Sequence, residues 1–191
     1  MKPTPTIRDR LLDATFAHVY RYGYHGASTA AILRDADAPK GSMYHHFSSK
    51  KGMVLAMIRE RLTPKMKVFF DFSRPEGGSA LAVLEHTLDA MAANTPLITY
   101  GCPLHRLMLE MGALDPEILA ATQHEYDRLS TTLSDLLHHG METGEIRQDD
   151  PLKLAQHIIL SVWGFLSRPP ADSSAERFRY DCQYLIKRLR P

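Results

Sequence analysis

The sequence predicts an all-α protein that begins with a tri-helical helix-turn-helix head and continues as a helical C-terminal domain. Apolar residues recur at helical spacing along most of the chain, and no segment alternates apolar and polar residues with enrichment in β-branched types. Of the 191 residues, 44% are hydrophobic and 24% are charged. The chain is therefore long enough to bury a core, and its composition excludes wholesale disorder.

The first two predicted helices have recognisable ends. Thr6 is placed to cap the first helix, and Gly23 ends it. A shorter helix runs from Thr29 to about Ala36, with Ser28 as its N-cap. The apolar face of the first helix comprises Ile7, Leu11, Leu12, Phe16, Val19 and Tyr20.

A tight break at residues 37–39 separates this helix from another short one over 40–47. The following helix begins near Lys50, and we expect Pro64 to kink or shorten it because proline cannot donate a backbone hydrogen bond. Residues 74–79 form the clearest loop. Further helices are predicted at about 79–94, 103–113, 116–140, 150–167 and 173–189.

Charge is distributed unevenly. Residues 1–60 carry nine Lys and Arg against five Asp and Glu, whereas the remaining residues carry 14 against 17. A basic head on a mildly acidic body fits a polyanionic partner for the head alone. Ordinary scatter of charge explains the difference equally well.

The short helix over 40–47 has the side chains of a reading element. Lys40 adds positive charge at a helix N-terminus, which already favours phosphate, and Gly41 permits a close approach of the backbone. Met43 and Phe47 are four residues apart and can anchor the helix to the core. Hydrogen-bonding groups are supplied by Ser42, Tyr44, His45 and His46. These features favour DNA binding, although an ordinary surface helix with two exposed histidines has the same pattern.

The run K-G-S-x-Y-H-H-F-x-S-K from Lys40 to Lys50 strongly resembles the head of TetR/AcrR-type transcriptional regulators. The resemblance spans residues 7–60 and also includes Gly23-Tyr24, Ala27-Ser28, Ile32 and Ala36. The chain departs from the family at Ala27, where a hydroxyl residue is common, and at Asp37-Ala38, where Gly-Val is common. The resemblance implies a homodimer that binds a palindromic double-stranded DNA operator and is released by a small-molecule effector.

The resemblance also implies roles for individual residues. It assigns residues 1–49 to a DNA-binding domain and 50–191 to an effector-binding and dimerisation domain. The residues expected to face the major groove are Lys40, Gly41, Ser42 and His45. Those expected to contact phosphates or lie beside them are Ser28, Thr29, Tyr44, His46 and Lys50.

Candidate effector contacts are aromatic, methionine and polar residues of the predicted body helices. They are Met66, Phe70, Met91, Tyr100, Cys102, His105, Met108, Tyr126 and Trp163. Methionine and aromatic residues on helices serve equally well as plain core. Cys102 precedes Pro103 and lies near His105, a setting that activates a thiol, so an electrophile or oxidant is one candidate effector. A small buried hydrophobe is the simpler interpretation of Cys102.

Predicted helices 116–140 and 150–167 carry apolar stripes that can form a four-helix interface with a second subunit, or can pack within one subunit only. The longest apolar run, Ile158 to Leu166, is too short to cross a bilayer, and charge at Arg8 interrupts any signal peptide. We therefore expect a cytoplasmic protein with no membrane partner and with reduced thiols at Cys102 and Cys182.

The main hypothesis is a transcriptional repressor; an activator fits the sequence equally well. The chain has no nucleophile elbow, phosphate loop or zinc-protease motif, and its histidines lack compact ligand spacing. We therefore expect no enzymatic activity, no cofactor and no metal site. The alternative hypothesis is an all-helical small-molecule-binding protein or enzyme without DNA binding, which leaves the 40–50 run unexplained.

Overall fold

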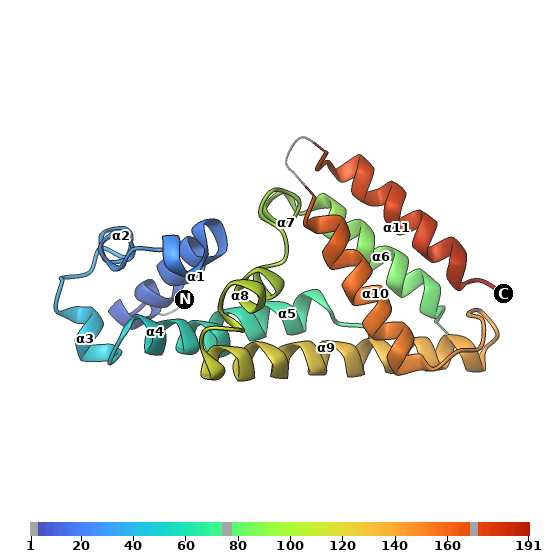
Figure 1. Ribbon diagram of the computed structural model, residues 1–191, viewed down its shortest axis with the longest axis horizontal. Helices are drawn as coiled ribbons and strands as arrows, with labels where there is room; N and C mark the ends of the chain where they lie inside the picture. Colours follow the sequence, from blue (N-terminus) through green and yellow to red (C-terminus); the bar gives the residue numbers. More distant parts are fainter. Residues whose placement is uncertain (1–3, 74–77, 169–171) are drawn as a thin grey trace. The chain divides into compact units, whose positions relative to one another are not determined.

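Figure 1 shows the computed structural model, which describes residues 4–73, 78–168 and 172–191. Every regular element in these ranges is a helix, so the predicted all-α class is confirmed. Most of the predicted loop at 74–79 lies outside the described residues.

The chain forms two compact units. Unit 1 contains Met1–Val68 and Pro103–Glu125, and unit 2 contains Phe69–Cys102 and Tyr126–Pro191. The functional division into residues 1–49 and 50–191 stays a prediction.

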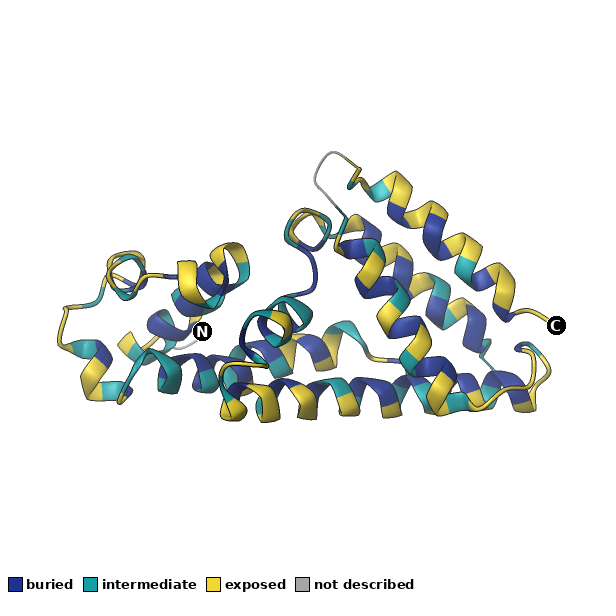
Figure 2. Cartoon of the chain, viewed as in Figure 1, coloured by how far each residue is buried: buried dark blue, intermediate teal, exposed yellow. Residues whose placement is uncertain are grey.

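Unit 1 is built on a long first helix. Its elements are α1 (Ile7–Gly26), α2 (Thr29–Asp35), α3 (Ser42–His46), α4 (Lys50–Met57), the π-helical turn η1 (Ile58–Leu62), α5 (Thr63–Phe69, whose last residue falls in unit 2), α8 (Pro103–Met111) and the first part of α9 (Pro116–Glu142). Figure 2 shows buried positions along the inner faces of α1 and α4. The side chains that are almost completely buried include Leu11, Leu12, Ile32, Met53, Met57 and Leu104. These residues form the core that supports α2 and α3.

The predicted ends of α1 are confirmed, with one addition. The Thr6 hydroxyl accepts a hydrogen bond from the Asp9 N–H (3.1 Å), and the Asp9 carboxylate accepts one from the Thr6 N–H (3.2 Å). Hydrogen bonds from Thr6 and then from Arg61 lower the pKa of Asp9 to about 2. At the other end, regular geometry breaks at Gly23, where φ is +78°, and one further turn reaches Gly26.

Pro64 neither ends nor shortens its helix. The chain widens instead into the π-helical turn η1, where the Thr63 N–H bonds to the Ile58 carbonyl, and it continues as α5. Pro64 has no N–H to offer the Glu60 carbonyl, and the Arg61 guanidinium donates to that oxygen at 3.2 Å. The sequence predicted a disturbance of the helix near Pro64 but not the π-helical turn that the structure shows.

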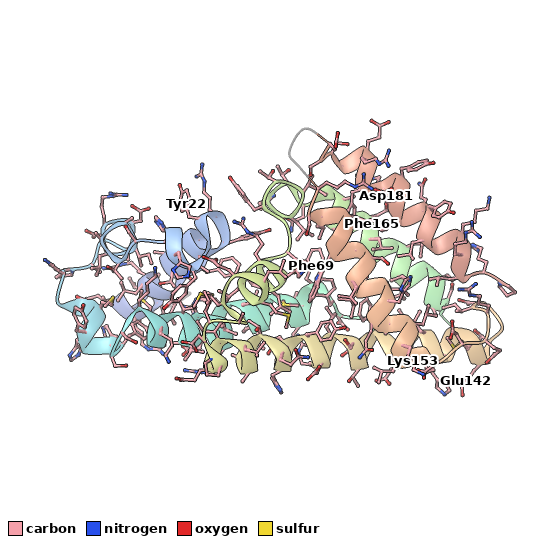
Figure 3. All side chains as sticks on the ribbon, in the orientation of Figure 1. Tyr22, Phe69, Glu142, Lys153, Phe165 and Asp181 are labelled. Atoms are coloured by element: carbon pink, nitrogen blue, oxygen red, sulfur yellow. The ribbon has the colours of Figure 1, made fainter. Side chains whose placement is uncertain are left out.

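Unit 2 is a helical bundle. It contains α6 (Ala80–Ala93), α7 (Thr95–Tyr100), α10 (Pro151–Leu166), α11 (Ala175–Leu189) and the later part of α9. Figure 3 shows side chains along these helices, with Phe165 on α10 and Asp181 on α11. The sequence missed α7, which is six residues long and too short to show a period. Its start is fixed by Asn94, whose side chain accepts a hydrogen bond from the Leu97 N–H at 3.1 Å.

Candidate nucleic-acid interface

The short helix α3 is fixed on one side and open on the other. Met43 is 3% exposed and Phe47 is 6% exposed, so the predicted pair of anchors lies in the core. Tyr44, between them in sequence, is 70% exposed. The Ser42 N–H bonds to the Pro39 carbonyl (2.8 Å), which closes the turn that leads into the helix. Burial of two side chains four residues apart therefore presents the opposite face of α3 to solvent.

The predicted DNA-facing residues fall into two groups. Those exposed to solvent are Ser28, Lys40, Gly41, Tyr44 and His45. Those half-buried are Thr29, Ser42, His46 and Lys50. Ser28 caps α2 as predicted, because its hydroxyl accepts the Ala31 N–H at 3.1 Å. The rings of His45 and His46 meet edge to face with centroids 4.9 Å apart.

The turn between α2 and α3 is held from α1. Asp37 has a positive φ of 47°, a conformation that side chains disfavour and that the glycine common in related turns adopts freely. The Arg10 guanidinium donates to the Ala36 carbonyl (2.8 Å) and to the Asp37 carbonyl (2.9 Å). Sequence reasoning missed Arg10, because its partners lie 26 and 27 residues away. Two charge-assisted hydrogen bonds thus fix the angle at which α3 leaves α2.

Lys50 is engaged within the protein. Its ammonium donates to the Tyr24 carbonyl at 2.5 Å and lies 4.7 Å from the centre of the Tyr24 ring. Burial lowers the pKa of Lys50. The side chain therefore links the start of α4 to the end of α1. If Lys50 also binds a DNA phosphate, its ammonium contacts that phosphate and Tyr24 at the same time.

Glu110 on α8 completes this junction. Its carboxylate accepts hydrogen bonds from the Tyr24 N–H (2.7 Å) and the His25 N–H (2.8 Å), directly after the break at Gly23. A Cβ atom on Gly23 would lie 2.5 Å from a Glu110 carboxylate oxygen. Local sequence gives no sign of Glu110, which is 85 residues or more from its partners. Its carboxylate satisfies two backbone donors that the interrupted helix leaves open.

A second link joins α4 to the start of α9. The Lys51 ammonium contacts Glu117 at 2.5 Å and Asp115 at 3.4 Å. Asp115 also accepts the N–H groups of Glu117 and Ile118, and its bond from Ile118 is the main cause that lowers the pKa of Asp115. Asp115, just before α9, and Glu117, in its first turn, thereby contact α4.

The predicted effector contacts are divided between the units. Phe70, Met91 and Trp163 line an apolar cavity of about 40 Å³ in unit 2, where α6, α9 and α10 also contribute aliphatic side chains. Tyr126 is not part of that lining, but its ring packs against Trp163 with centroids 5.4 Å apart. The sequence could not select the remaining lining residues, because any apolar position of a helix looks alike before the helices are packed.

The other predicted effector residues are not part of this lining. Tyr100 is half-buried and Cys102 is buried in unit 2; Met66, His105 and Met108 belong to unit 1. Burial lowers the pKa of His105. Pro103 is the first residue of α8, as predicted, so Cys102 directly precedes that helix. The second thiol, Cys182, is buried, and burial raises its pKa to about 12.

Two kinds of feature are absent from residues 4–73, 78–168 and 172–191. No helix there is long and apolar enough to span a membrane. No group of three or more His, Cys, Asp or Glu residues in these ranges is arranged to hold a metal ion.

The exposed, doubly anchored α3 in a tri-helical head, together with a helical unit that contains an apolar cavity, defines a helix-turn-helix regulator with a ligand-binding body. The family model for bacterial regulatory proteins of the tetR family matches residues 11–57, and that for the tetracyclin repressor-like C-terminal domain matches residues 80–183. The chain belongs to the TetR family of transcriptional regulators. This is a family of regulators and not of enzymes.

Relatives and solved structures agree with this assignment. An uncharacterised HTH-type transcriptional regulator from Lactococcus lactis subsp. lactis is 30% identical over 161 residues, which cover 83% of this chain and 81% of the relative. The HTH-type transcriptional repressor DhaR from Mycobacterium sp. (strain GP1) is 24% identical, with coverage of 92% and 88%. A regulatory protein TetR from Rhodobacter sphaeroides has the same fold, with a TM-score of 0.82, 24% identity and coverage of 94% and 96%.

Proposed function

We propose that the protein is a repressor that binds operator DNA as a homodimer and dissociates when a small molecule occupies the cavity of unit 2. The observation that carries DNA binding is the geometry of α3, which buries Met43 and Phe47 and leaves Tyr44 open. A buried anchor on one face and polar side chains on the other suit a helix that enters the major groove. The alternative, a small-molecule-binding protein or enzyme without DNA binding, does not explain this exposed polar face.

Within this proposal, phosphate contacts set affinity and base contacts set sequence preference. In this proposal the residues that read base edges are Lys40, Gly41, Ser42 and His45. The residues that contact the phosphate backbone, or flank such contacts, are Ser28, Thr29, Tyr44, His46 and Lys50.

These roles separate in an operator selection from randomised DNA. We expect His45→Ala to relax preference at one or two base pairs, at a cost of about 1–3 kcal/mol against the original site. We expect Tyr44→Phe, which removes only an exposed hydroxyl, to weaken all sequences alike. A change of preferred sequence in Tyr44→Phe, or an unchanged preference in His45→Ala, would reverse the assignment.

The dimer interface of the proposal uses α10 and α11. Leu160 on α10 is 56% exposed and Tyr184 on α11 is 57% exposed, with Leu152 and Tyr180 also open to solvent. The exposed positions on the unit 2 part of α9 are Asp127, Thr131, Asp135, His138 and Glu142. Their polarity favours α11 over α9 as the partner of α10, in contrast to the interface expected from sequence.

Leu160→Glu is expected to convert the dimer to monomers, because it places a charge in an apolar interface. The matched control is Leu109→Glu, since Leu109 on α8 is 69% exposed and belongs to unit 1. Sedimentation equilibrium measures both variants. Equal dissociation in the two variants, or none in Leu160→Glu, would remove α10 from the interface.

Electrophile sensing through Cys102 stays a prediction of the sequence. It requires alkylation of Cys102 to reduce operator binding. Cys182 offers an internal reference, because its raised pKa keeps the thiol protonated and unreactive at neutral pH.

A further inference from the structure

The cavity of unit 2 offers a ligand almost no polar group. None of its described lining side chains is titratable, and Thr87 supplies the one hydroxyl. That hydroxyl already donates to the Val83 carbonyl at 2.9 Å on the same helix. Trp163 contributes its indole ring with one N–H, and the remaining surface is aliphatic, aromatic or thioether, as at Leu84 and Met91. The lining therefore contains one hydroxyl, one indole N–H and otherwise only apolar groups.

Such a lining discriminates by charge. A carboxylate, ammonium or phosphate group would lose its hydration with no charged partner in return. A molecule with several hydroxyls would leave most of them unpaired. We infer that the cavity takes an uncharged, predominantly apolar small molecule. This inference rests on the proposed function, because it names the chemical class of the effector.

The size of the cavity links binding to a change of conformation. At about 40 Å³ it is smaller than the roughly 150 Å³ apolar cavity that is known to accept benzene. A ring-sized ligand must therefore displace lining side chains, among which Met91 has three rotatable bonds and Phe70 is only half-buried. Two lining residues, Leu129 and Leu133, belong to α9. The part of α9 up to Glu125 belongs to unit 1, and the rest belongs to unit 2. Ligand entry thus acts on a helix shared by both units.

Trp163 provides the readout, because it is the chain's one tryptophan and lines the cavity. We would titrate the full-length protein with toluene, benzoate and benzylamine, which share a ring and differ in charge. Toluene is expected to change Trp163 emission saturably and to raise the melting temperature. Benzoate and benzylamine at equal concentration are expected to do neither. Binding of either charged probe as tightly as toluene, or no saturable response to toluene, would overturn the inference.

A pair of matched variants locates the site. Val162→Ile adds one methylene to a lining residue of α10, whereas Val83→Ile makes the same change outside the lining on α6. We expect Val162→Ile to weaken toluene binding about fivefold or more and Val83→Ile to leave it unchanged. Equal effects of the two variants would place the toluene site elsewhere and contradict the inference.

Fluorescence anisotropy of a labelled DNA fragment from the region upstream of the gene separates the inference from the proposed function. If toluene occupies the cavity and DNA stays bound, the ligand class of the cavity holds and regulation by that ligand fails. If DNA binds and no toluene response is seen, the repressor stands and the ligand class is wrong.

Discussion

Gly23→Ala is expected to lower the free energy of unfolding by about 2–4 kcal/mol. At φ +78° and ψ +176°, a region almost exclusive to glycine, a side chain costs about 1–3 kcal/mol, and the new Cβ would meet the Glu110 carboxylate at 2.5 Å. Moving that carboxylate weakens its hydrogen bonds from the N–H groups of Tyr24 and His25. Urea denaturation measures the loss.

The chain contains a control for each part of this cost. Gly144 has φ +74°, and no atom lies within 4 Å of the position that a Cβ would take there, so Gly144→Ala reports the backbone cost alone. The Glu110→Ala background removes the clash, so there Gly23→Ala should cost less than in the otherwise native chain. Equal costs of Gly23→Ala in the native and the Glu110→Ala backgrounds would show that Glu110 does not hold the junction.

Phe47→Ala and Tyr44→Ala are expected to abolish operator binding for different reasons. Phe47 is buried, so its truncation costs about 3 kcal/mol of stability and releases α3 from the core. Tyr44 is exposed, so its truncation leaves stability within about 0.5 kcal/mol and removes a contact to DNA. Thermal unfolding and operator binding are measured on both variants. Both should lose operator binding, but only Phe47→Ala should lose stability.

The conservative variant Phe47→Leu keeps an apolar anchor and should retain most of the operator affinity. A Tyr44→Ala protein that binds its operator like the native chain would show that Tyr44 on the exposed face of α3 does not contact DNA. A Phe47→Ala protein of native stability would show that the anchor is not what positions the helix.

Local signals predicted much of the head. The caps at Thr6 and Ser28, the break at Gly23 and the anchors Met43 and Phe47 each depend on residues within a few positions of one another. These interactions are local, so composition and spacing suffice to find them. The same spacing placed the long helices of both units to within a few residues.

Tertiary partners were not predictable in this way. Arg10 holds the turn after α2, and Glu110 holds the break in α1, through hydrogen bonds to backbone atoms that any residue type carries. Before Pro64 the helix forms a π-helical turn, and the Glu60 carbonyl accepts a hydrogen bond from the Arg61 guanidinium. The cavity residues became distinct from other core positions only once α6, α9 and α10 were packed. Packing, not local pattern, decides each of these features.

The most direct test of operator recognition measures binding of the native protein to the DNA upstream of its gene across a salt series, beside a scrambled fragment of equal length. Tight binding to the upstream fragment that weakens steeply with salt, protects a site with twofold symmetry and is lost in Tyr44→Ala is the predicted result. Equal affinity for both fragments, or binding that is indifferent to Tyr44, would contradict it.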